Sequence, residues 1–367
     1  MAVINKNQLK TKKTIALVLF LLYVGALSLL AQNIPRTYIA QNTNEDIYID
    51  GIMDEPSWNK AVWSTKFVDI EGQKKPTYDT QFKMLWDDKY IYFFAEIKEP
   101  HVWATLKKRD TIIFYNNDFE IFLDPGGDTH NYYEFEINAF NTIWDLYLSK
   151  PYRNKGHILD GWDFKGIKSA VHINGTLNDA SDIDVGWNVE IAIPWSFTTD
   201  PGGTTHVPEN EFWRVNFSRV NWDFDLENGR YYRKKDASGN FLPEYNWVWS
   251  PQGVINMHEP EHWGYVYFAK ESSNIPSEFS IPEDEHIKWY LYELYRNLKN
   301  EKIGEKGWNL KNGSLQRTPT IILNKPVVPI LEKNNFGFNI WTKSPFTNKI
   351  LVIHTDGKFE TYDDKTN

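Results

Sequence analysis

Apolar and polar residues alternate through much of the chain between Asp46 and Lys270, and a period of two is typical of β-strands rather than helices. Turns rich in Gly, Pro, Asn and Asp separate the alternating segments. This series predicts an all-β fold, an antiparallel and jelly-roll-like β-sandwich. The strands are expected at Thr80–Trp86, Tyr90–Ile97, Asp118–Asp124, Tyr132–Asn138, Gly186–Ile193, Phe212–Val220 and Trp263–Phe268. One short helix is expected at Asp54–Ala61, capped by Asp54.

The composition changes after residue 270. Ser, Pro and Glu are frequent over residues 271–282, which we interpret as a linker. Apolar residues at spacings of four, three and four then predict a helix within Pro282–Lys302; they are Ile287, Leu291, Leu294 and Leu298. Val327–Tyr362 is expected to form three strands, with the last hairpin turning near Asp356–Gly357. Residues 283–367 are thus predicted to be a small α+β appendage of unknown role beside a sandwich domain of residues 38–270.

The N-terminus has the pattern of a secretory signal. Four lysines precede the apolar run Thr14–Ala31, and a small residue stands before Gln32. We therefore expect residues 1–31 to be a signal peptide cleaved between Ala31 and Gln32, which would make the protein secreted or periplasmic. An uncleaved anchor is the alternative, because the apolar run just reaches spanning length. No other segment is apolar enough to span a membrane.

Composition excludes several classes of function. The chain has no cysteine, which rules out thiolate metal sites, cysteine nucleophiles, disulfides and covalently attached c-type haem. Its net charge is −9 and no block of Lys or Arg lies beyond the N-terminus, so nucleic acid is not expected as a partner. The 16 Trp and 20 Tyr residues offer many rings for stacking on a ligand.

Five segments in order carry a resemblance to a known family. They are IDGIMDEPSWNKA (Ile49–Ala61), MLWDDKYIYFFAEIKEP (Met84–Pro100), NDFEIFLDP (Asn117–Pro125), YYEFEINAFNTIWD (Tyr132–Asp145) and GWNVEIAIPW (Gly186–Trp195). Together they resemble the family 9 carbohydrate-binding modules of secreted bacterial proteins, over Tyr38–Ala269. The resemblance implies a β-sandwich that grips sugar ends between two aromatic rings, and calcium ions that support the structure.

The resemblance also suggests site residues. It matches the two rings to Tyr115 and Trp249, and two polar groups that bind sugar hydroxyls to Glu120 and Asn138. The family's sugar-binding arginine falls at Glu136, and this departure bears on reducing-end specificity. A sugar ring stacks its flat face on an aromatic ring while polar groups bind its hydroxyls in plane, which suits this residue set.

The hairpin of Asp118–Asp124 and Tyr132–Asn138 permits an inference about register. If its turn is centred on Asp128, Glu120 lies directly opposite Glu136, where like charges repel. A cation, a proton on one raised pKa, or a neighbouring arginine must then compensate. The candidate arginines are Arg214, Arg219 and Arg109, and Arg219 and Glu136 are also predicted to be among the carbohydrate-binding residues.

Three further hypotheses follow from these residues. Glu120 and Glu136 could be the paired carboxylates of a glycoside hydrolase. Met257–His258 is the one pair that suggests haem ligation. Asp124 and Asp128 flank two glycines and could offer oxygens to calcium.

The resemblance favours binding over catalysis. The expected function is non-catalytic binding of carbohydrate outside the cytoplasm, in support of polysaccharide breakdown and beside a glycoside hydrolase partner.

Overall fold

The computed structural model describes residues 34–270, 278–299 and 312–364. The predicted signal peptide and residues 271–277 of the predicted linker lie outside these described residues. None of the helices in the described part of the chain has the length and apolar character needed to cross a bilayer.

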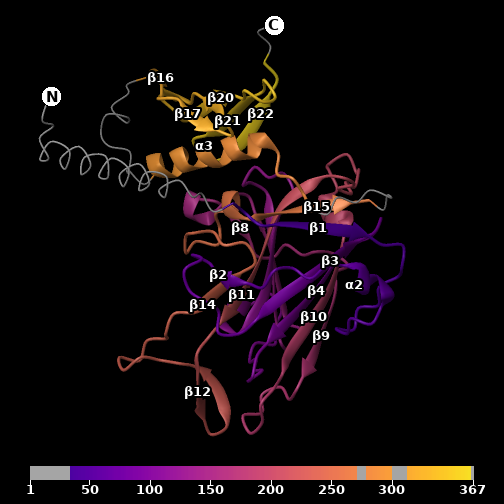
Figure 1. Ribbon diagram of the computed structural model, residues 1–367. Helices are drawn as coiled ribbons and strands as arrows, with labels where there is room; N and C mark the ends of the chain where they lie inside the picture. The colour runs from indigo at the N-terminus through magenta and orange to yellow at the C-terminus, as the bar shows by residue number, and fades with distance from the viewer. Residues whose placement is uncertain (1–33, 271–277, 300–311, 365–367) are drawn as a thin grey trace, which may run out of the picture. The chain divides into compact units, whose positions relative to one another are not determined.

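The strands of the sandwich form one continuous hydrogen-bonded sheet, in the order β8-β7-β6-β5-β11-β15-β1-β3-β4-β10-β9, with β14 joining β11 to β2 (Figure 1). The first part of this order comprises β8 (Ile158–Leu159), β7 (Ile143–Leu148), β6 (Tyr132–Asn138), β5 (Asp118–Asp124), β11 (Phe212–Asn221), β15 (Gly264–Ala269), β14 (Tyr245–Val248) and β2 (Val68–Asp69). The second part comprises β1 (Thr37–Asn42), β3 (Thr80–Trp86), β4 (Tyr90–Lys98), β10 (Gly186–Pro194) and β9 (Lys168–Asn174).

The two parts of the sheet fold over each other and enclose one core. Phe82 of β3 stacks on Phe217 of β11 with 3.8 Å between ring centroids, which joins the two layers. The predicted sandwich is therefore confirmed. It departs from a purely antiparallel sheet at β1, which pairs in parallel with both β15 and β3.

The alternating segments were reliable guides to the strands. The predicted ranges Thr80–Trp86, Asp118–Asp124 and Tyr132–Asn138 agree with β3, β5 and β6 to the residue. In each, the apolar face points into the core and the opposite face is also largely buried, because further segments cover it. On the outer face of β5–β7, Trp263 and Met257 from the segment between β14 and β15 pack on Phe122.

The short helix covers the outer face of the layer that contains β3, β4 and β10. Helix α2 (Pro56–Lys60) begins after Glu55, which makes no capping hydrogen bond, so the prediction that Asp54 caps it is wrong. The helix is held instead by Trp58, whose ring is buried against Phe94 and whose Nε1 donates to Glu190 Oε1 at 3.1 Å.

The C-terminal appendage is a helix packed on a small sheet. Helix α3 (Glu283–Lys299) buries its predicted apolar stripe against β20 and β21 (Figure 1). The prediction of three strands is one short, because β19–β22 are four, and their sheet also includes β16. The strands are β16 (Gly313–Gln316), β19 (Ile330–Asn334), β20 (Gly337–Lys343), β21 (Ile350–His354) and β22 (Phe359–Tyr362), with a separate pair β17 (Thr320–Ile322) and β18 (Lys325–Val327). The predicted turn at Asp356–Gly357 joins β21 to β22.

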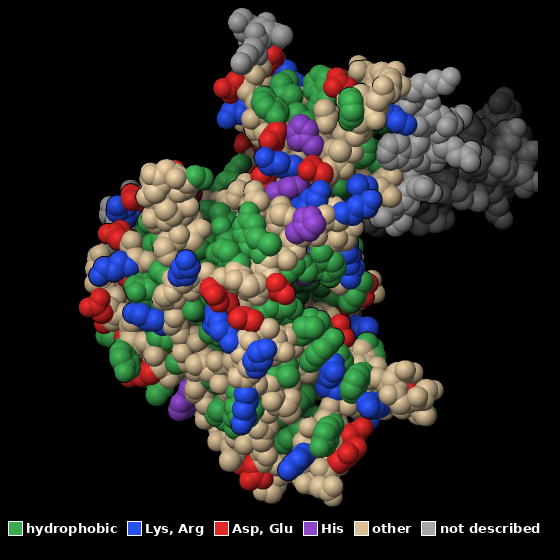
Figure 2. Space-filling model, turned by 180° about the vertical axis from the view of Figure 1, so that it is seen from behind, with side chains coloured by type: hydrophobic (Ala, Val, Ile, Leu, Met, Phe, Trp, Pro, Cys, Tyr) green, Lys and Arg blue, Asp and Glu red, His purple; other side chains and the backbone are tan. Residues whose placement is uncertain are grey.

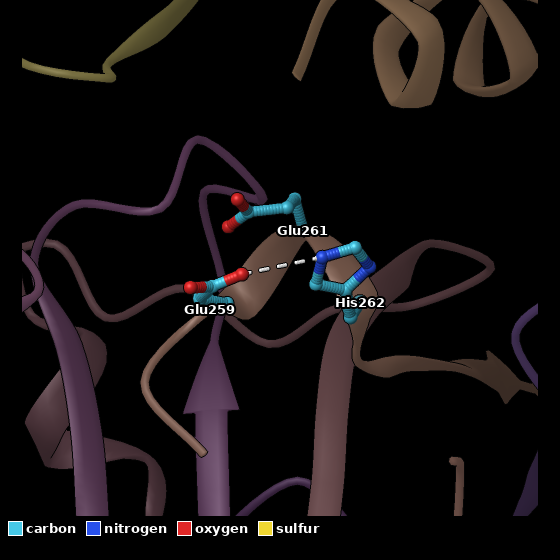
Figure 3. A group of neighbouring side chains, drawn as sticks. All are labelled: Glu259, Glu261 and His262. Carbon is cyan, nitrogen blue, oxygen red and sulfur yellow. Dashed lines mark ion pairs between the residues drawn. The ribbon is translucent and has the colours of Figure 1, made fainter. Parts of the chain in front are cut away.

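The appendage is joined to the sandwich by buried polar contacts. Glu285 of α3 accepts a hydrogen bond from the Tyr265 hydroxyl at 2.7 Å and lies 3.6 Å from Arg214. Arg296 of the same helix pairs with Glu261 at 2.5 Å and with Glu259 at 3.6 Å; both acids lie at η4 (Pro260–His262), beside His262 (Figure 3). The appendage thus completes the burial of the outer face of β15.

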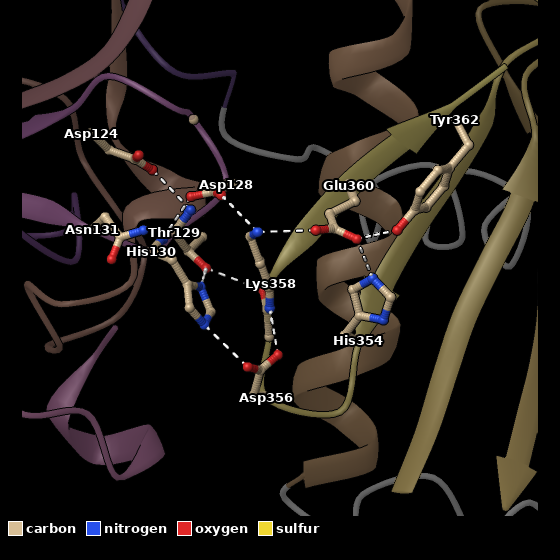
Figure 4. Close-up of polar contacts among 12 residues, drawn as sticks. Asp124, Asp128, Thr129, His130, Asn131, His354, Asp356, Lys358, Glu360 and Tyr362 are labelled. Atoms are coloured by element: carbon tan, nitrogen blue, oxygen red, sulfur yellow. Dashed lines mark hydrogen bonds and ion pairs between the residues drawn. The ribbon is translucent and has the colours of Figure 1, made fainter. Parts of the chain in front are cut away.

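The same appendage holds the turn between β5 and β6. Thr129 and Tyr292 both donate to the carbonyl of Gly357, at 3.1 and 3.0 Å. His130 lies 3.4 Å from Asp356, across from the turn (Figure 4). Residues of the β21–β22 hairpin therefore fix this end of the β5–β6 hairpin.

Candidate functional site

A pocket of about 610 Å³ opens at the other end of β5 and β6. It lies between η1 (Ile113–Tyr115) and the hairpin of β12 (Phe224–Glu227) and β13 (Arg230–Arg233). Around this hairpin, at the lower right of Figure 2, hydrophobic side chains lie among basic and acidic ones. The pocket is lined by Trp103, Thr105, Leu106, Tyr115, Asn116, Asp225, Glu227, Tyr231, Tyr232, Arg233, Lys235 and Phe241. We call it the loop-end pocket.

Aromatic rings dominate the loop-end pocket. Tyr115, Tyr232 and Phe241 are 42%, 45% and 48% exposed, so their rings are accessible to a ligand. Beneath them Trp103 and Tyr231 are buried and stack with centroids 6.1 Å apart and planes at 9°. The buried stack gives the exposed rings a firm base.

The turn that carries Tyr115 is held by hydrogen bonds on both sides. The backbone N–H of Phe114 donates to Glu136 Oε2 at 3.0 Å, and the carbonyl of Phe114 accepts from Trp222 Nε1 at 2.7 Å. Asn116, the residue after Tyr115, accepts a hydrogen bond from the Asn138 side chain at 3.2 Å. The strand end of β6 therefore positions η1, and η1 positions the Tyr115 ring.

A guanidinium lies among the rings. Arg233 is 4.4 Å from the Tyr115 centroid, 4.6 Å from Trp222 and 4.0 Å from Phe241. Its guanidinium makes no hydrogen bond or ion pair within the described ranges of the chain, so its N–H groups are free to donate to a ligand. Partial burial lowers the pKa of Arg233, which remains charged.

Of the predicted ligand residues, only Tyr115 lies at the pocket surface. Glu120 is 4% exposed, Glu136 is 1% exposed and Asn138 is fully buried, so a sugar does not reach them in this arrangement. The predicted register is confirmed, because Glu120 is the direct partner of Glu136. Glu136 and Asn138 support the turn of Tyr115 rather than face a ligand.

The structure corrects the assignment of Trp249. Its side chain is 1% exposed and packs edge-on against Phe82, with centroids 5.3 Å apart. A Cβ on Gly264 would lie 2.3 Å from the Trp249 ring, so that position must be glycine for the ring to fit. Trp249 follows β14 directly into the core and presents no face to a ligand.

Arg219 is a structural residue as well. It is fully buried, lies 3.5 Å from Glu99 and donates to the carbonyl of Lys98 at 2.9 Å. Burial raises the pKa of Glu99, and Arg219 opposes that rise. Glu99 also lines a smaller cavity of about 240 Å³.

The turn of Asp124 and Asp128, where the sequence suggested calcium, is held by hydrogen bonds and by cations of the chain itself. Asp124 accepts from the Thr129 N–H at 2.9 Å, and Asp128 accepts from the His130 N–H at 2.9 Å. The ammonium of Lys288 donates to the Gly127 carbonyl, and that of Lys358 lies 3.9 Å from Asp128 (Figure 4). Two ammonium groups of the chain thus lie at this turn, while Asp124 Oδ1 is buried without a hydrogen-bond partner, and calcium at Asp124 and Asp128 stays a prediction.

The glycoside hydrolase hypothesis and the haem hypothesis also lack a cavity for their ligands in the described part of the chain. Glu120 and Glu136 are 4% and 1% exposed, and neither lines the loop-end pocket or the cavity beside Glu99, so a glycosidic bond does not reach the two carboxyl groups in this arrangement. His258 Nδ1 is engaged with the Tyr132 hydroxyl at 2.9 Å. Burial lowers the pKa of His258 to about 3. Met257 and His258 cover the outer face of β5–β7 rather than line a haem cavity.

Four carboxyl groups lie close together on the outer face of β5 and β6, which other segments cover. Asp118, Glu120, Glu134 and Glu136 are all buried, and burial raises the pKa of each. The pKa of Glu120 rises to about 7. Repulsion from Glu120 further raises the pKa values of the other three.

The sequence interpretation missed the hairpin that carries most of the pocket. Asn228–Gly229 is a strong hairpin signal, and it does join β12 to β13. The residues that follow, Tyr231, Tyr232 and Arg233, alternate between the buried base and the exposed surface. This signal was available, but it lies in a segment without the long alternation of the core strands.

Comparisons with known proteins concern the sandwich. Residues 49–230 match the family model described as "Carbohydrate family 9 binding domain-like". Exoglucanase XynX of Acetivibrio thermocellus is 28% identical over 156 residues, which are 42% of this chain and 12% of that protein. Endo-1,4-beta-xylanase A of Thermoanaerobacterium saccharolyticum is 29% identical over 156 residues, 42% of this chain and 11% of that protein. The matches thus span only a small part of these relatives.

One solved structure is a family 9 carbohydrate-binding module from Caldicellulosiruptor kristjanssonii in complex with cellotriose. It is 16% identical, covers 67% of this chain and 100% of that chain, and gives a TM-score of 0.43.

Proposed function

The chain belongs to the carbohydrate family 9 binding domain-like family through residues 49–230, and from this premise we propose that it binds saccharides in the loop-end pocket. The family and the fold support carbohydrate binding in general. The place of binding on this chain is our proposal, and it differs from the position that the resemblance alone suggested.

The exposed aromatic surface is the observation that carries this proposal. Tyr115, Tyr232 and Phe241 present accessible rings around one hollow, and apolar faces of sugars stack on such rings. Arg233 offers free N–H donors, and Glu227 offers acceptor oxygens for hydroxyl groups. Rings and in-plane polar groups together are what a saccharide site requires.

We further propose that the protein acts outside the cytoplasm, in support of polysaccharide breakdown. The signal pattern of residues 1–31 supports export. The names of the relatives, an exoglucanase and a xylanase, support a role beside glycoside hydrolases. Gluco- and xylo-oligosaccharides are therefore the first ligands to test.

The test is a glycan-array screen followed by calorimetric titration of the saccharides that bind. Tyr115→Ala and Phe241→Ala should each weaken binding by about 1–3 kcal/mol, the usual cost of removing an aromatic anchor. Tyr48→Ala is the matched control, because Tyr48 is 74% exposed and lies outside the pocket lining. Release of reducing sugar, monitored in parallel, should stay at background. Equal affinities in wild type and both pocket variants would remove the loop-end pocket from the proposal.

A further inference from the structure

Two basic residues line the loop-end pocket without an acidic partner. They are Arg233 and Lys235, and neither makes an ion pair with any residue that the structure describes. The ammonium of Lys235 lies 4.9 Å from the centroid of the Phe241 ring, and the guanidinium of Arg233 lies 4.0 Å from the same centroid. Both positive charges are therefore found beside one exposed ring of the pocket.

The acidic residues of the pocket lining have basic neighbours of their own on the β12–β13 hairpin. Asp225 lies 3.8 Å from the ammonium of Lys234. Glu227 is the direct cross-strand partner of Arg230, and opposite charges at such positions attract each other. The lining acids are thus balanced elsewhere, and the two unpaired cations give this part of the pocket a positive character.

Three aromatic rings hold the guanidinium of Arg233. Besides Phe241, it lies 4.4 Å from the Tyr115 centroid and 4.6 Å from the Trp222 centroid. The side chain is half-buried against these rings, which removes part of its water. The charge of Glu244 acts on Arg233 from beyond ion-pair distance. A cation that is fixed in place, partly desolvated and free of internal hydrogen bonds binds an anion more strongly than a hydrated one does.

We propose that the loop-end pocket prefers saccharides that carry a carboxylate, the uronic acids, and that Arg233 selects them. A guanidinium is planar, and its parallel N–H groups match the two oxygens of a carboxylate. A uronic acid keeps the ring of the corresponding neutral sugar, so its apolar face still stacks on the exposed rings of the pocket while its carboxylate reaches Arg233. This inference rests on the proposed function, because it names the class of saccharide that the same site takes.

The smaller cavity beside Glu99 has the opposite character. The one Lys or Arg in its described lining is Lys234, which already lies 3.8 Å from Asp225. Glu99 and Asp223 line the same cavity, and the buried Arg219 lies 3.5 Å from Glu99. An acidic sugar is therefore expected in the loop-end pocket and not in the smaller cavity.

The first test compares two ligands that differ in one group. A xylo-oligosaccharide with a glucuronic acid branch is titrated calorimetrically beside the same oligosaccharide after reduction of its carboxylate to an alcohol. The wild type should bind the acid about tenfold more tightly, which corresponds to one charge-assisted contact. NaCl at about 0.5 M should remove most of the difference, since salt screens an accessible charge pair.

The outcomes of this titration separate the preference from the site. Equal affinities for the two ligands at low salt would overturn the preference for a carboxylate and leave the saccharide site in place. No binding of either ligand would overturn the site and the preference together. Tighter binding of a matched oligosaccharide with a sulfate ester would contradict the choice of a carboxylate as the anionic group.

The second test assigns the preference to Arg233. Arg233→Gln should bind the acid and the reduced ligand about equally, because the charge and the paired N–H groups are lost. Arg153→Gln is the matched control and should keep the tenfold difference, since Arg153 is an exposed arginine beside Tyr152 and outside the pocket lining. Arg233→Lys, a milder change in case Arg233→Gln does not fold, should lower the preference severalfold. A preference that neither substitution lowers would overturn the role of Arg233.

Discussion

The two ends of the β5–β6 hairpin carry acidic residues on the same outer face, yet the chain treats them differently. At the turn end, Asp124 lies opposite Arg214, and Lys288 of the appendage reaches the carbonyl of Gly127. At the pocket end, Glu120 lies opposite Ser218, and no cation of the chain pairs with it in the described ranges. Contacts with the appendage close the turn end, which we call the joint, whereas the pocket end lies beside the exposed rings of the loop-end pocket.

The largest effect is expected at the joint. Glu285→Ala leaves Arg214 buried without its ion-pair partner, so we expect a loss of about 3–5 kcal/mol of unfolding free energy. Urea denaturation measures it, and Glu283→Ala, on an exposed residue of the same helix, is the control. A loss no greater than that of the control would mean that the appendage is only loosely attached and that the two ends do not differ in this way.

The joint also changes the expectation for a truncated chain. Removal of everything after Ala269 exposes Tyr265 and Arg214, which are buried by contacts with α3. We therefore expect the truncated sandwich to be insoluble or strongly destabilised, although the family resemblance ends at that residue. A truncated chain with the stability of the full protein would show that the joint contributes little.

An intermediate effect is expected at His258, which covers the face between the two ends. Burial lowers its pKa from 6.5 to about 3, so the unfolded chain binds a proton below pH 6.5 while the folded protein does not. Stability is lost as pH falls through this window. Between pH 7 and pH 5 the wild type should lose about 2 kcal/mol more unfolding free energy than His258→Gln. The control is His157→Gln, on an exposed histidine. Equal losses in wild type and His258→Gln would mean that His258 binds its proton as readily in the folded protein as in the unfolded chain, and that burial does not lower its pKa.

The smallest effect is expected within the pocket. Arg233→Lys keeps the charge but loses the planar group that lies against Tyr115 and Phe241, so saccharide binding should weaken by about 1 kcal/mol. Calorimetric titration measures it. Lys234→Arg, on an exposed neighbour outside the lining of the loop-end pocket, should leave the affinity unchanged. Affinity that rises on Arg233→Lys would show that the guanidinium blocks the ring rather than assists the ligand.

The sequence predicted the strands and the register of β5 and β6 because alternation reports directly on which residues share a face. It did not predict what covers the opposite face. Glu120 and Asn138 alternate away from the core residues and so seemed accessible, but η1 and the segment before β15 bury them. Trp249 stands outside any alternating run, and only the three-dimensional path of the chain after β14 shows that its ring enters the core.

The sequence did not predict the contacts between the appendage and the sandwich either. Its helical stripe predicted α3, but the polar residues that join it to the sandwich, such as Glu285 and Arg296, look like an ordinary solvated helix face. Long-range pairing of this kind has no local pattern in sequence. The loop-end pocket is similar, because Tyr115 and Phe241 are far apart along the chain and meet only through the β12–β13 hairpin.

The most direct test of the difference between the two ends is one calorimetric titration of the same saccharide into wild type, Tyr115→Ala and Glu285→Ala, with the folded fraction of each determined beforehand. The account predicts that Tyr115→Ala weakens binding by about 1–3 kcal/mol while folded Glu285→Ala binds like the wild type. Unchanged affinity in Tyr115→Ala, or an equal loss in folded Glu285→Ala, would contradict the assignment of the pocket end as the ligand end.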